Sequence, residues 1–122
     1  MLKINNKDCE VLEETIKFTK SKINNKEGYS ILLSVDFNGG YLSFYIDFFD
    51  KKDLKKIENQ IFTKEQIKMF ELYSDKQFID YIDGEIYLKF GAISNNSAET
   101  TLKIDDQEVK LEYNGLLLLD KD

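Results

Sequence analysis

Two clusters of carboxylates flank predicted turns and are the residues best suited to chemistry. They are Asp80, Asp83 and Glu85 around one turn, and Asp105, Asp106 and Glu108 around the other. Carboxylate oxygens are suitable ligands for hard cations such as magnesium or calcium. Neither cluster has the alternating D-x-D-x-D-G spacing of a calcium loop. Solvated turn acids are therefore the favoured interpretation, and a metal-dependent enzyme ranks last among the functions considered.

Residue counts exclude most other catalytic chemistry. The chain has no histidine, so the familiar nucleophile–histidine pairs and triads cannot be assembled, and one cysteine cannot complete a His/Cys zinc site. Gly39-Gly40 leads into a predicted strand and lacks the Gly-Lys-Ser/Thr ending of a phosphate loop, which indicates a hairpin turn. We expect Cys9 to be a small buried hydrophobic residue, because neither histidine nor arginine is present to activate it. These observations predict no enzyme, no cofactor and no metal.

A face that combines tyrosines and acids is the best candidate for binding. On a predicted hairpin, Asp36, Tyr41, Tyr45 and Asp47 share the side opposite the apolar residues. Tyrosine offers a large, rigid contact area with a polar tip and is enriched at interface hot spots. The alternative is that a mid-chain helix covers this face and uses the tyrosines as half-buried packing. We predict that Asp36, Tyr41, Tyr45, Asp47, Asp80, Asp83 and Glu85 bind a basic partner.

The hairpin that positions this face is the clearest element in the sequence. Apolar residues occupy every second position from Tyr29 to Phe37 and again from Leu42 to Phe48. A two-residue type I′ turn at Asn38-Gly39 would place every apolar residue on one face. The predicted pairs are Val35 with Leu42, Leu33 with Phe44, Ile31 with Ile46 and Tyr29 with Phe48.

The middle of the chain has helical signals. Asp50 is suited to an N-cap with Asp53 in the first turn, and Leu54, Ile57 and Ile61 recur at helical spacing. This pattern predicts a helix from about 51 to 62. Thr63 and Gln66 match a capping box, which predicts a second helical stretch that carries Ile67 and Phe70 as far as Tyr73.

Two further hairpins are predicted downstream. Asp83-Gly84 would pair Tyr81 with Ile86 and Ile79 with Leu88, although a short helix capped by Ser74 is an alternative for this segment. After a polar loop at Ser94 to Ser97, two runs flank Asp105-Asp106. The second hairpin would bring together Leu102, Ile104, Val109 and Leu111.

The sequence patterns at the two ends of the chain each allow two structures. Leu116 to Leu119 is apolar on both faces, which predicts a strand buried on both sides or, alternatively, an exposed edge that pairs with a second copy. Near the start, Leu2 and Ile4 alternate, as do Ile16 and Phe18. We expect strands there, with a helix over Cys9 to Lys20 as the alternative.

Composition fits a single domain, 1–122, with the fold class α+β: antiparallel sheet built from hairpins with one or two helices inserted mid-chain. The formal charge of −6 disfavours nucleic acid and anionic membranes and would attract a basic partner. The favoured explanation of this charge taken alone is that it keeps a small domain soluble. The chain has no long apolar run and no apolar leader, and its single cysteine suits a reducing compartment, so we expect a cytoplasmic protein.

The order of elements resembles small bacterial immunity proteins of the WapI-associated type. The resemblance covers residues 29 to 113 and depends on a β-hairpin, the helix motif D-K-K-D-L-K-K-I, the run F-I-D-Y-I-D-G-E-I-Y-L-K-F and a terminal meander. It implies a protein that binds and neutralises a cognate toxin domain without catalysis. We predict an immunity protein or antitoxin that acts on a basic toxin, and the alternative is a β-module that self-associates through Leu116, Leu117, Leu118 and Leu119.

Overall fold

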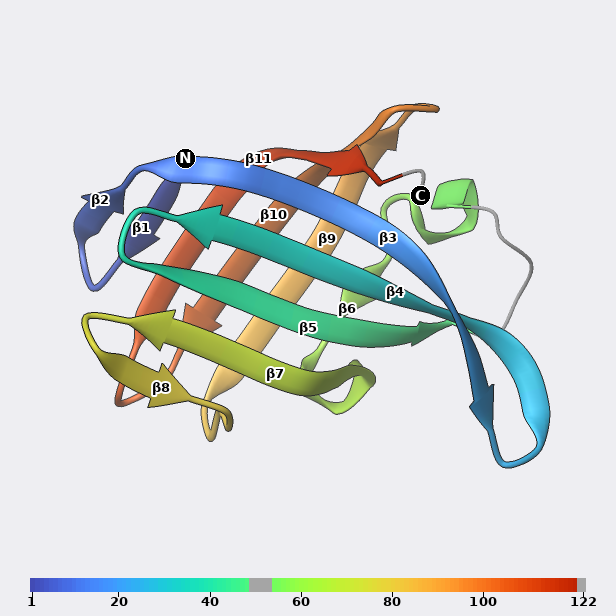
Figure 1. Cartoon of the computed structure of the whole chain (residues 1–122), viewed down its shortest axis with the longest axis horizontal. Helices are drawn as coiled ribbons and strands as arrows, with labels where there is room; N and C mark the ends of the chain where they lie inside the picture. Colours follow the sequence, from blue (N-terminus) through green and yellow to red (C-terminus); the bar gives the residue numbers. More distant parts are fainter. Residues whose placement is uncertain (49–53, 121–122) are drawn as a thin grey trace.

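The protein is an almost entirely β structure in which one sheet curls into a half-barrel (Figure 1). The computed structural model describes residues 1–48 and 54–120, and strands account for 71% of these described residues. The α+β prediction is therefore wrong, because the described residues contain no α-helix and only two short 3-10 turns. Nor do these residues include a helix with the length and apolar character needed to cross a bilayer.

The described elements follow one another as β1 (Leu2–Ile4), β2 (Lys7–Cys9), β3 (Val11–Ile23), β4 (Lys26–Phe37), β5 (Gly40–Phe48), η1 (Leu54–Ile57), β6 (Ile61–Phe62), η2 (Lys64–Gln66), β7 (Ile67–Ser74), β8 (Gln77–Ile79), β9 (Glu85–Ile93), β10 (Ser97–Asp105) and β11 (Lys110–Leu119).

The sheet folds over on itself into two facing layers (Figure 1). Its strand order is β6-β9-β10-β11-β3-β4-β5-β7-β8, and β1 pairs with β11 and β2. We call β3, β4, β5, β7 and β8 the front layer, and β6, β9, β10 and β11 the back layer. The layers join where β11 runs parallel to β3, with Leu118 beside Thr15 and Leu119 beside Ile16. All other pairings between these strands are antiparallel.

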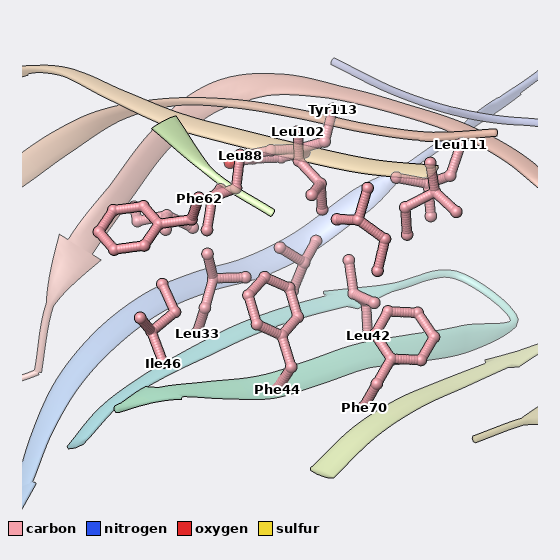
Figure 2. Packing of buried hydrophobic residues seen from close by; sticks show 14 of the residues in the cluster. Leu33, Leu42, Phe44, Ile46, Phe62, Phe70, Leu88, Leu102, Leu111 and Tyr113 are labelled. Atoms are coloured by element: carbon pink, nitrogen blue, oxygen red, sulfur yellow. The ribbon is translucent and has the colours of Figure 1, made fainter. Parts of the chain in front are cut away.

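The core lies between the inner faces of the two layers (Figure 2). Phe44 and Leu33 from the front layer point toward Leu88 and Leu102 from the back layer, and all four are fully buried. Because side chains alternate across a strand, the same strands turn their remaining residues outward. The outer faces are therefore where functional side chains can lie.

The β4–β5 hairpin has the predicted register. Val35 pairs with Leu42, Leu33 with Phe44, Ile31 with Ile46 and Tyr29 with Phe48. The predicted core placement of Phe48 lies outside the described side chains. Of the two loop residues only Gly39 has a positive φ, 102°, so the turn is not type I′, which needs positive φ at both positions.

Three other hairpin turns do have positive φ at both loop residues, as type I′ turns require. These loops are Asn5-Asn6, Asn24-Asn25 and Asp75-Lys76. The first two close the identical sequence Ile-Asn-Asn-Lys, and asparagine tolerates the left-handed region better than most residues. They explain why the N-terminal segment forms strands, as expected, and not the alternative helix from Cys9 to Lys20.

The predicted helix from about 51 to 62 is wrong over its described part. Only Leu54–Ile57 turns, as a 3-10 helix, and Ile61 already belongs to strand β6. Leu54 and Ile57 are buried. A spacing of three matches the 3-10 period of three residues per turn, so the apolar signal was correct while the helix type was not. The predicted N-cap Asp50 and the predicted first-turn acid Asp53 lie outside the described residues.

The second predicted helix is also wrong, and a β-bulge explains why. Thr63 donates its N–H to Gln66 Oε1 at 3.0 Å, but the 3-10 turn stops at Gln66 and strand β7 begins at Ile67. Between Ser43 and Tyr45 the β5–β7 register shifts by one extra residue on β7, where Met69 has φ 51°. The bulge lets Ile67 and Phe70 both face inward at a spacing of three, which imitates a helix.

The hairpin predicted about Asp83-Gly84 does not form. β8 turns back onto β7, with Ile79 beside Leu72, and β9 pairs instead with β10 and β6. The alternative short helix after Ser74 is equally wrong. Asp80 to Gly84 crosses between the layers, and a Cβ on Gly84 would collide with the Asp105 carbonyl oxygen. The Asp-Gly signal marks a close backbone approach here and not a hairpin.

The last hairpin is confirmed with a longer loop. β10 and β11 pair from Ser97–Leu118 to Asp105–Lys110, which leaves residues 106–109 as the loop, and the polar turn begins at Ser94 as expected. Leu102, Ile104, Val109 and Leu111 are all buried together. Of the helix motif that carries the resemblance to immunity proteins, the described part is Leu54–Ile57, which forms a 3-10 turn. The resemblance itself stays a prediction.

Candidate functional site

A row of outward side chains crosses the front layer. Asp36 on β4 lies beside Tyr41 on β5, which lies beside Tyr73 on β7, which lies beside Phe78 on β8. Neighbouring strands are about 4.8 Å apart, so the row spans roughly 14 Å. The Tyr41 and Tyr73 rings stack with centroids 6.2 Å apart and an interplanar angle of 20°. We call Asp36, Tyr41, Tyr73 and Phe78 the aromatic row.

The aromatic row is open to solvent. Phe78 is 50% exposed and Tyr73 is 37% exposed, while Tyr41 is half-buried. The alternative that a mid-chain helix covers this face is not met, since the described residues form no such helix. The Tyr41 ring instead stacks against the ring of its cross-strand neighbour Tyr73.

Tyr45 and Asp47 lie further along the same face of β5. Tyr45 is half-buried between Leu32 on β4 and Lys68 on β7. Asp47 accepts a hydrogen bond from Ser30 Oγ at 3.3 Å. Tyr45 lies four positions along the strand from Tyr41, about 13 Å away. Tyr45 and Asp47 therefore share the face with the aromatic row but stand apart from it.

An acidic cleft adjoins the end of the aromatic row. It has a volume of about 320 Å³ and lies between β8 with its following loop and the β10–β11 loop. Phe78 belongs to both the row and the cleft, and Tyr81 at the cleft is 69% exposed. The residues that line the cleft are Phe78, Ile79, Asp80, Tyr81, Asp83, Asp106, Gln107 and Glu108.

The Asp106 carboxylate links the two loops that line the cleft. Its carboxylate accepts hydrogen bonds from the N–H groups of Gly84 at 2.7 Å, Asp83 at 3.0 Å and Glu108 at 3.1 Å. These backbone donors, the Glu108 N–H foremost, lower the pKa of Asp106. Asp106 therefore fixes the crossing loop to the β10–β11 loop, and Asp80, Asp83 and Glu108 remain to set the charge of the cleft.

The predicted acids Asp80, Asp83 and Glu85 do not form one cluster. Asp80 and Asp83 both line the cleft, whereas Glu85 lies on the outer face of the back layer beside Asp105. Within the described chain, no group of three or more acids or cysteines is arranged to hold a metal ion. Of the six acids in the two predicted clusters, Asp106 anchors a loop through hydrogen bonds, and the other five are exposed.

Cys9 is partly buried against the core rather than fully buried as expected. Its Sγ lies 3.7 Å from the Lys7 carbonyl oxygen. Burial raises the pKa of the Cys9 thiol, which disfavours the nucleophilic thiolate.

The run from Leu116 to Leu119 is neither buried on both sides nor an edge. β11 pairs with β10 on one side and with β3 at Leu118 and Leu119 on the other. Leu117 is buried, while Leu116 and Leu118 are 51% and 57% exposed on the outer face. Backbone pairing with a second copy is therefore blocked at Leu118 and Leu119. Self-association through the leucine side chains stays a prediction.

Three exposed aromatic residues of the site were missed from the sequence: Tyr73, Phe78 and Tyr81. Tyr73 was placed at the end of a helix, and the other two in a hairpin with β9. The signal for Tyr73 was present, because Phe70, Leu72 and their polar neighbours alternate as a strand should. The pairing of Phe78 with Tyr73 needed the Asp75-Lys76 turn, which is not a common hairpin sequence.

Comparisons with protein families, with characterised proteins and with solved structures give no match to this chain.

Proposed function

We propose that this protein binds a basic protein partner through the aromatic row and the acidic cleft, without catalysis. The observation that carries the proposal is the continuity of the two features at Phe78, which joins stacked tyrosines to Asp80 and Asp83. Aromatic rings supply contact area, and exposed carboxylates attract and orient cationic side chains.

A like-charge neighbour supports the proposal. Glu13 on β3 lies directly beside Asp36 at the start of the aromatic row. Facing like charges destabilise a sheet, so this pair costs folding free energy. A cationic partner would offset that cost on binding.

The half-buried environment of Asp47 and Tyr45 makes them secondary contacts in this proposal. Asp47 is engaged by Ser30, and Tyr45 has Lys68 beside it. The expected cytoplasmic location belongs to the same proposal and is supported by the unpaired Cys9.

Neutralisation of a toxin is one form that this binding could take. The direct test is a pull-down with the C-terminal domain of a secreted toxin encoded immediately upstream of this protein's gene. Capture that is lost in the Asp80→Lys variant supports an immunity role at this site. Capture that Asp80→Lys leaves intact places the contact elsewhere.

The general proposal is tested with a peptide probe. A labelled peptide of about eight residues with alternating lysine and threonine is long enough to span the site. We expect it to bind and the matching glutamate–threonine peptide not to bind, as measured by fluorescence anisotropy. Asp80→Lys should weaken binding at least about tenfold.

The matched control is Glu112→Lys, which changes the net charge equally on the outer face of the back layer. It should change affinity less than about twofold, because Glu112 belongs neither to the aromatic row nor to the lining of the cleft. Equal losses in the two variants would show that net charge alone attracts the peptide and would overturn the proposed site.

A further inference from the structure

The two ends of the curled sheet are protected to different degrees. At the back-layer end, β9 is followed in the strand order by β6, and Glu58 forms an isolated bridge with Phe90. The Phe90 carbonyl oxygen also accepts the Asn59 N–H at 2.7 Å, and Glu58 Oε2 accepts the Ile93 N–H at 3.2 Å. The edge of β9 is therefore occupied by the η1–β6 segment.

The front-layer end has no such cover among the described residues. β8 pairs with β7 on one side, and the strand order ends there. Its three residues are Gln77, Phe78 and Ile79. Edge strands usually carry lysine, proline or a bulge that discourages further pairing, and β8 has no charged residue and no proline. The two-residue Asp75-Lys76 turn makes Ser74–Gln77 and Leu72–Ile79 the hydrogen-bonded pairs, so within β8 it is Phe78 that directs its N–H and C=O away from β7, toward the open edge. The acidic cleft lies beside this edge.

An added strand would meet both chemical features of the site. It would run about 4.8 Å from β8, with alternate side chains on the outer face next to Phe78. Asp80 follows β8 directly and Asp83 comes three residues later. Both line the cleft along which such a strand would lie. Their charge selects lysine or arginine in the added strand, and the exposed Phe78 ring favours the aliphatic stems of those side chains.

We infer that an extended, lysine- or arginine-rich segment of another protein binds by adding a strand to the free edge of β8. This inference rests on the proposed function, because it specifies how the basic partner is held. Main-chain hydrogen bonds to β8 would supply affinity, and the acids would select the sequence.

The experiment compares the lysine–threonine peptide with the same peptide N-methylated at its central residues. N-methylation removes backbone donors and leaves the charges unchanged. We expect N-methylation to weaken binding at least about tenfold in fluorescence anisotropy. We also expect the unmethylated peptide to slow amide hydrogen exchange at Phe78, whose N–H points to the open edge. The Lys103 and Thr101 amides on β10 are an internal reference that should stay unchanged.

The outcomes distinguish failure of strand addition from failure of the basic-partner proposal. Equal affinity of both peptides, with no slowing at β8, would overturn strand addition while leaving the basic-partner proposal intact. Failure of both peptides to bind would overturn both. Weakening by N-methylation together with slowed exchange at β8 supports strand addition, and slowing confined to the loop at Asp80 to Asp83 counts against it.

Discussion

The outer faces of the two layers differ in how their charges are arranged, although both arise from the same alternation along strands. On the back layer, Glu112 lies between Lys3 and Lys103, so opposite charges are neighbours. On the front layer, Glu13 lies beside Asp36, and the row continues with aromatic rings. The back face also has a like-charge pair, Glu85 beside Asp105, so the contrast is local: Glu112 has a lysine on each side, whereas Asp36 at the start of the aromatic row has Glu13 beside it.

The neighbours of a charged side chain affect the stability of the sheet and the binding of a partner in opposite ways. Opposite charges directly across a sheet contribute to folding, and like charges oppose it. A surface that retains like charges beside exposed tyrosines is poorly suited to stabilise its own fold and well suited to a cationic partner. The back layer therefore serves as the internal reference for every test of the front layer.

The largest effect is expected where the layers share one core. Phe44→Ala removes a fully buried ring between them and should lower the free energy of unfolding by about 3–5 kcal/mol in urea denaturation. Leu118→Ala, on the outer face, should change it by no more than about 0.5 kcal/mol. A Phe44→Ala loss below about 1 kcal/mol would mean that the layers do not pack as one core.

An intermediate effect should distinguish the two outer faces. Tyr73 on the front layer and Tyr87 on the back layer are both 37% exposed, which makes them a matched pair. Tyr73→Ala should weaken binding of the lysine–threonine peptide about tenfold, about 1.4 kcal/mol, because it removes an aromatic contact. Tyr87→Ala should leave affinity within about twofold in the same anisotropy measurement. Similar losses from both would remove the contrast between the faces.

The smallest effect concerns Glu14, at the seam where β3 meets β11. The buried Tyr113 hydroxyl donates a hydrogen bond to Glu14 Oε2, and burial raises the pKa of Glu14 above 4.5. The folded state therefore holds this proton more tightly than the unfolded state. The resulting stability is fully present below about pH 4.5 and is lost as pH rises through the raised pKa.

Urea denaturation across this pH range checks the prediction. Relative to Glu14→Gln, which cannot ionise, the unfolding free energy of the wild type should fall as pH rises above 4.5. Glu13→Gln changes an exposed neighbour and should retain the wild-type trend. Parallel curves for wild type and Glu14→Gln would contradict a desolvated carboxylate at the seam.

Strict alternation made the β4–β5 hairpin and the β10–β11 core predictable, because a period of two has few structural interpretations. The helical predictions failed where irregularities altered that period. The bulge at Met69 spaced Ile67 and Phe70 as a helix would, and the 3-10 turn at Leu54 to Ile57 matched part of a longer helix.

The candidate site combines residues that the sequence analysis selected with others that it did not. Asp36, Tyr41, Asp80 and Asp83 were selected from two separate patterns, a hairpin face and a turn, and the structure joins them through Tyr73 and Phe78. Glu85 was grouped with Asp80 and Asp83 because it is close in sequence, yet it lies on the other layer. Proximity along a chain does not fix position when the chain crosses between layers.

The sequence by itself determined which side chains face inward and outward along most strands, because neighbouring residues on a strand must point to opposite faces. Only the tertiary structure decided which strands are neighbours. That choice depends on long-range pairing and on where the sheet curls, and no local period encodes either. It is this choice that left β8 as an open edge beside the acidic cleft.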